Sequence, residues 1–129
     1  MLTCIALMLS VSLAELPSLA SQVEAEARAL TAQTEITPSF MAGIGEFSGH
    51  AEQLSAALRQ AGVEQDLPCI FHGIAEDARE RAAEFEAAGD AGARAAAFTN
   101  LRVLLDDAIL IAPMAASAAA EASQLVAAR

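Results

Sequence analysis

Residues 37–62, "TPSFMAGIGEFSGHAEQLSAALRQAG", carry the clearest pattern in this chain of 129 residues. Apolar residues return in alternating steps of four and three positions, which places them along one narrow face of an α-helix. Thr37 followed by Pro38 is a typical helix start, and Gly62 suits the left-handed residue that ends many helices. The stretch therefore predicts a long amphipathic helix. Its apolar seam consists of Phe40, Ile44, Phe47, Ala51, Leu54, Leu58 and Ala61.

Three further segments show the same helical spacing of apolar residues. They cover residues 16–34, residues 66–89, opened by Asp66 and Pro68, and residues 90–112, capped by Asp90. No run of residues alternates with period two, so strands are not expected. The three seams are Leu16, Leu19, Val23, Ala27 and Leu30; Leu67, Phe71, Ile74, Ala78, Ala82 and Phe85; and Ala97, Leu101, Leu104, Ala108 and Ile111.

Short connections between these helices predict how the helices are arranged. A connection of a few residues makes consecutive helices antiparallel neighbours. We therefore expect an all-α fold, an up-and-down antiparallel bundle of four main helices, in a single domain over residues 1–129. An apolar N-terminal helix over residues 1–16 and a short Ala-rich C-terminal helix over residues 114–128, beyond Pro113, are expected in addition.

The first 16 residues, "MLTCIALMLSVSLAEL", are apolar on nearly every helical face. They are too short to cross a bilayer, which takes about 20 apolar residues, so no membrane span is expected. A buried helix is one interpretation. A secretory signal over residues 1–20 is the other, although no basic residue precedes Arg28.

Charge and cysteine content narrow the classes of function. The chain has 17 acidic and 7 basic residues and a formal net charge of −10, so it lacks the cation clusters that nucleic acid requires. All basic residues are arginine, which is consistent with a GC-rich bacterial genome. Cys4 and Cys69 form no disulfide framework, and we expect reduced thiols in the cytoplasm. Export is the alternative if residues 1–20 are a signal peptide.

One cluster of residue types could bind a metal ion. Cys69, His72 and Glu76 lie on one helical stripe, and His50 could complete the set. The doubled C-x-x-C or H-E-x-x-H spacing of strong zinc sites is absent, so the start of an ordinary helix is the simpler interpretation. A reactive thiol at Cys69, in the first turn of a helix, is a further alternative.

Two other groups of residues ask for an explanation. Small residues at Ala42, Gly45, Gly49 and Ala56 predict the close approach of another helix or the wall of a pocket for an apolar ligand. Asp106 and Asp107 interrupt the most apolar stretch of the chain. Arg102, four residues before Asp106, predicts a helical ion pair with it.

The excess of apolar helix surface suggests a function through contact. No combination of nucleophile and base is evident, so we expect a non-enzymatic protein without a cofactor. We expect a homodimer or the partner of another helical protein, and the alternative is a bundle that binds a small ligand or metal through Cys69, His72 and His50. The expected interface consists of Leu2, Ile5, Leu9, Val103, Leu105, Ile109, Leu110 and Met114.

Overall fold

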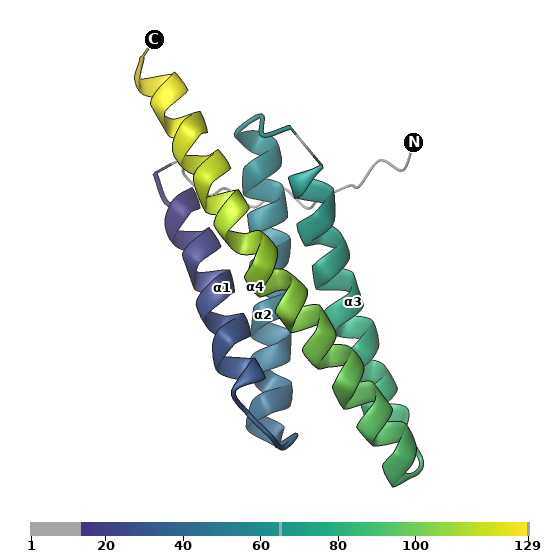
Figure 1. Cartoon of the computed structure of the whole chain (residues 1–129). Helices are drawn as coiled ribbons and strands as arrows, with labels where there is room; N and C mark the ends of the chain where they lie inside the picture. The colour runs from purple at the N-terminus through teal and green to yellow at the C-terminus, as the bar shows by residue number, and fades with distance from the viewer. Residues whose placement is uncertain (1–13, 65, 129) are drawn as a thin grey trace.

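The computed structural model describes residues 14–64 and 66–128, and these residues form four α-helices and no strand (Figure 1). The prediction of an all-α fold with four packed helices is thereby confirmed. The predicted N-terminal helix falls almost entirely outside the described residues. The helices are α1 (Leu16–Thr31), α2 (Pro38–Gln60), α3 (Leu67–Ala87) and α4 (Ala91–Ala127).

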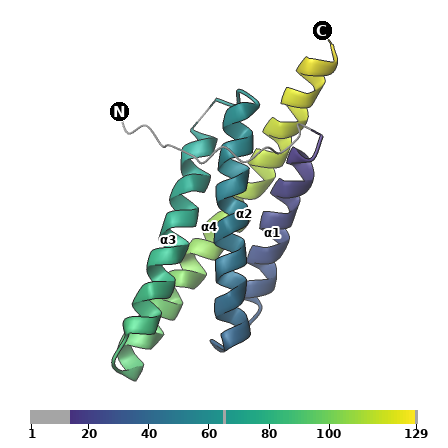
Figure 2. The ribbon, with the colours of Figure 1, turned by 180° about the vertical axis from the view of Figure 1, so that it is seen from behind.

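Each helix packs against two others. α1 lies against α2 and α4, and α3 lies against α2 and α4, so α1 and α3 occupy opposite corners. Successive helices point in opposite directions along the bundle, and α1 and α3 begin at the same end (Figures 1 and 2). α4 is the longest helix and crosses the others obliquely (Figure 1).

The core forms where the predicted seams meet. On α2, the six seam residues from Phe40 to Leu58 are all buried, and Phe40 also contacts Phe98 of α4 edge to face, at 5.7 Å between ring centroids. Phe71 of α3 is fully buried as well. The seams of α3 and α4 are buried except at their C-terminal ends, where Ala82, Phe85 and Ile111 are only half-buried.

Helix starts follow the predicted capping at two sites. The Thr37 hydroxyl accepts a hydrogen bond from the backbone N–H of Phe40 at 3.1 Å. The Asp90 carboxylate accepts one from the N–H of Ala93 at 2.7 Å. Each cap satisfies a backbone donor that the first helical turn leaves without an intrahelical partner.

The predicted end of α2 is also present. Gly62 has φ of 74°, and the N–H of Val63 donates to the carbonyl of Leu58 at 3.0 Å, a Schellman motif.

The predicted cap at Asp66 is wrong. Asp66 precedes α3 with φ of 64° and ψ of 0°, and its side chain makes no capping hydrogen bond. A capping side chain reaches the first N–H groups from extended backbone. The left-handed backbone at Asp66 directs the side chain elsewhere.

The predicted break at Pro113 is absent too. α4 continues through Pro113 to Ala127, so residues 114–128 form no separate helix. The ring of Pro113 is on the exposed side, while Ala112, Ala115 and Ala119 extend the buried seam at helical spacing. This packing outweighs the lost hydrogen bond to the carbonyl of Ile109.

Two buried serines join α2 to α3. The Ser48 hydroxyl donates a hydrogen bond to the carbonyl of Ala75 at 2.9 Å, and the Ser55 hydroxyl donates one to the carbonyl of Pro68. Both buried hydroxyls therefore have a hydrogen-bond acceptor.

Candidate functional site

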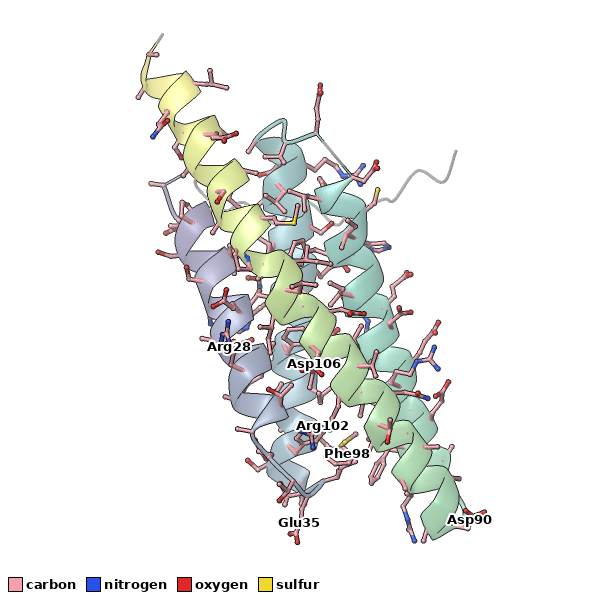
Figure 3. All side chains as sticks on the ribbon, viewed as in Figure 1. Arg28, Glu35, Asp90, Phe98, Arg102 and Asp106 are labelled. Atoms are coloured by element: carbon pink, nitrogen blue, oxygen red, sulfur yellow. The ribbon has the colours of Figure 1, made fainter. Side chains whose placement is uncertain are left out.

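An apolar stripe on the outer side of α4 is the most prominent surface feature of the described residues. Val103, Leu110 and Met114 have exposed fractions of 56%, 75% and 57%. Steps of seven and four positions place them on one side of the helix, opposite the buried seam. We call these three residues the α4 stripe. The outer side of α4 faces the viewer in Figure 3.

The structure corrects part of the predicted interface. Leu105 is fully buried, because it lies on the same side of α4 as Leu101 and Ala108. Ile109 is half-buried and packs against the core. The predicted interface on α4 is therefore reduced to the α4 stripe and the exposed edge of Ile109. Leu2, Ile5 and Leu9 lie outside the described residues.

Acidic side chains flank the α4 stripe. Asp106 and Asp107 are exposed on either side of it. The predicted ion pair of Arg102 with Asp106 is not formed. Arg102 donates instead to the carbonyl of Thr31 at 3.3 Å and lies 5.7 Å from the ring centre of Phe98 (Figure 3). A carbonyl at the end of α1 and an aromatic face together hold the guanidinium away from the acid.

The predicted metal ligand His72 belongs to a cluster of charged groups between α2 and α3. Its Nδ1 atom lies 2.8 Å from Oε1 of Glu52, and its Nε2 atom lies 3.2 Å from Oε1 of Glu76. Arg79 approaches the other oxygen of Glu52 at 3.4 Å. Both imidazole nitrogens therefore already have protein partners, and the cluster ties α3 to α2.

His50 lies at a different interface. Its Nδ1 atom is 2.6 Å from Oε1 of Glu26, an ion pair between α2 and α1 when the imidazole is protonated, although the contact lacks hydrogen-bond geometry. His50 thus contacts α1, while His72 and Glu76 belong to the α2–α3 cluster. Over residues 14–64 and 66–128, no three His, Cys, Asp or Glu side chains are grouped so that they could hold a metal ion.

Cys69 differs from its predicted state. The structure has it disulfide-bonded, not as a free thiol, and Nη2 of Arg59 lies 3.9 Å from its sulfur. An oxidised sulfur is neither a thiolate nucleophile nor a thiolate ligand. Cys4, the second cysteine of the chain, lies outside the described residues.

The small-residue strip of α2 is not explained by close helix packing. A Cβ atom added at Gly45 or Gly49 would meet no atom within 4 Å, although Ala56 on the same strip is buried. The close approach occurs at Gly43 instead, where a Cβ would come within 2.9 Å of Cδ2 of Leu30.

A polar crevice of about 360 Å³ between α3 and α4 adjoins the α4 stripe at Val103. Asp77 and Asp107 supply two carboxylates there, and Arg81 supplies a guanidinium. A side-chain hydrogen bond to Glu84, at 2.6 Å, together with the charge of that carboxylate, raises the pKa of Arg81 above its ordinary value. The crevice is open, and its lining brings no nucleophile next to a base.

A second hollow lies at the end of the bundle where α4 begins. It is a shallow, mainly apolar groove of about 290 Å³. Its lining consists of Glu35, Ile36, Phe85, Arg94, Ala95 and Phe98. None of the predicted ligands Cys69, His72 and His50 lines it.

Among the described residues, one helix, α4, is long and apolar enough to cross a membrane by length and composition alone. In the bundle, its buried residues face the other helices, and its outer side carries two aspartates halfway along. Carboxylates are costly in the centre of a bilayer.

A comparison of the chain with protein-family models, curated proteins and solved structures finds no match.

Proposed function

We propose that this protein is a non-enzymatic interaction protein that forms a homodimer through the α4 stripe, on an up-and-down antiparallel bundle. The observation that supports this proposal is the high exposure of Val103, Leu110 and Met114 on one side of a long helix. Full burial of one such side chain contributes roughly 1.5–3 kcal/mol, so contact between two stripes is favourable.

Charge selects the orientation of the two helices. In a parallel pair, Asp106 and Asp107 of one copy would face the same residues of the other, and like charges would be brought together. In an antiparallel pair that crosses at Leu110, Asp106 faces Met114 and Asp107 faces Pro113. The net charge of −10 already opposes association of two copies. Keeping the aspartates of the two copies apart is therefore the more important. The proposed dimer is therefore antiparallel.

Sedimentation equilibrium of wild-type protein and of Leu110→Glu tests the interface. We expect a reversible dimer for the wild type. The variant should raise the dimer Kd by about 10–100-fold, because it places a carboxylate at the centre of the contact. Leu110 is 75% exposed, so the monomer should remain folded.

Ala42→Glu is the matched control. It adds the same charge to an exposed helical position, but on the small-residue strip of α2. We expect it to leave the Kd unchanged. A wild type that stays monomeric at high micromolar concentration contradicts the homodimer. Loss of the dimer in Ala42→Glu but not in Leu110→Glu would move the interface to α2.

A further inference from the structure

The groove at the end of the bundle where α4 begins combines apolar side chains with two charges of opposite sign. Ile36, Phe85 and Phe98 are half-buried in its lining, and Glu35 and Arg94 are exposed there. The lining comes from the connection between α1 and α2, from the last turn of α3 and from the first turns of α4. Glu35 and Phe98 are labelled at this end of the bundle in Figure 3.

Neither charge of the groove has a partner within residues 14–64 and 66–128. Arg94 forms no ion pair there. Other arginines do, since Arg28, Arg79 and Arg81 each contact a glutamate. Glu35 forms no ion pair with any described residue either, so the two side chains of the groove do not neutralise each other. Both charges therefore remain open to a ligand.

One wall of the groove is held in place by the bundle. Phe98 meets Phe40 edge to face, at 5.7 Å between ring centroids, and the guanidinium of Arg102 lies 5.7 Å from its ring centre. A ring fixed in this way receives an apolar group without first having to be ordered, which lowers the cost of binding. The volume of about 290 Å³ is at the small end of ligand pockets and suits a ligand with one bulky side chain.

We propose that this groove binds a free α-amino acid with an aromatic side chain, such as phenylalanine. The ring of the ligand packs on Ile36, Phe85 and Phe98. Its carboxylate faces Arg94, and its ammonium group faces Glu35. Each charge of the zwitterion then meets the opposite charge, whereas an aromatic acid or an aromatic amine would match one charge and be repelled by the other.

The expected affinity is low, because the groove is shallow and both of its charged side chains are exposed. A ligand of about 12 non-hydrogen atoms in such a groove gives a Kd on the order of 1 mM. The groove shares no residue with the α4 stripe, so this binding is independent of the proposed dimer.

Titration of the isotope-labelled full-length protein with phenylalanine, followed through the NMR shifts of backbone amides, tests the site. We expect saturable shifts at Ile36, Ala95 and Phe98. Phenylpropionate and phenethylamine, which each lack one of the two charges, should bind about 2–5-fold more weakly. Glycine has both charges but no ring, and it should not bind detectably.

Variants of the charged side chains test the role of each charge. Arg94→Gln and Glu35→Gln should each weaken phenylalanine binding about 2–5-fold. Arg94→Gln should also strengthen the binding of phenethylamine, and Glu35→Gln that of phenylpropionate, because each removes a repulsion. A merely structural role would not produce these opposite changes. Both residues are exposed, so the variants should remain folded.

Ala95→Trp fills the groove from an exposed position and should abolish binding. Leu110→Glu is the matched control on the α4 stripe, and it should bind phenylalanine as the wild type does. The proposal is overturned if no saturable shift appears up to about 20 mM phenylalanine, well above the expected Kd. It is equally overturned if Ala95→Trp binds as tightly as the wild type, or if phenylpropionate binds wild-type protein as tightly as phenylalanine.

Discussion

The glycines of α2 differ in the space available beside them for a side chain. Gly45 has open space where a Cβ would stand, whereas Gly43 has the tip of Leu30 there. Leu30 is buried, so its side chain has little room to move. Only Gly43 therefore has a packing reason within the described residues.

Replacing these two glycines with alanine should have different effects on stability. Gly45→Ala should raise the free energy of unfolding by about 0.5–1 kcal/mol, because alanine has the higher helix propensity and no clash arises. Gly43→Ala gains the same propensity but must displace the methyl group of Leu30, so its net gain should be smaller or negative. Urea denaturation of both variants measures the difference. Equal gains would contradict the close contact at Gly43.

Other residue-level predictions failed where two local interactions competed. The spacing of Arg102 and Asp106 allows an ion pair, but spacing cannot show that the end of α1 and the ring of Phe98 lie within reach of the guanidinium. Likewise, Asp66 is a frequent capping residue type, but its left-handed backbone depends on the path of the whole connection. Sequence alone does not contain either geometry.

At the scale of helices, periodicity was the reliable signal. The seam of α1 is buried as predicted, and so is the seam of α2 from Phe40 to Leu58, since a helix in water must cover its apolar side; Ala61, the last predicted seam residue, is half-buried. Boundaries that depend on one residue and its own backbone, such as Thr37 and Gly62, were also predictable. The end of α4 was not predictable from sequence. Proline is disfavoured within a helix, and here only packing against the other helices outweighs that cost.

Pro113 should therefore limit the stability of α4. Its substitution by alanine restores an N–H donor to the carbonyl of Ile109 and removes the ring clash, in a segment that is already helical. We expect Pro113→Ala to raise the free energy of unfolding by about 1–3 kcal/mol. Ser117→Ala, one turn further on the exposed side, is the control and should change stability by less than about 0.5 kcal/mol. A destabilised Pro113→Ala would indicate that α4 needs the proline for its path.

At the scale of the molecule, sequence could identify the apolar excess of α4 but could not divide it between core and surface. Leu105 and Leu110 stand five positions apart in the same apolar run. The direction of α4 across the bundle decides that Leu105 is fully buried and Leu110 is 75% exposed. A candidate interface was thus predictable as a segment, and its members required the three-dimensional arrangement.

This division between core and surface gives a test that combines folding with association. Leu105→Ala opens a cavity and should cost about 2–5 kcal/mol of stability at any protein concentration. Leu110→Ala should leave the Tm unchanged in dilute protein, because the monomer loses only exposed surface. If the protein dimerises, its Tm rises with protein concentration. Leu110→Ala should weaken this rise, whereas Leu105→Ala should leave it in place. Thermal denaturation across a hundredfold range of concentration separates the two effects. A wild-type Tm that does not change with concentration would remove the basis for a dimer, and the α4 stripe would then have to bind a different partner.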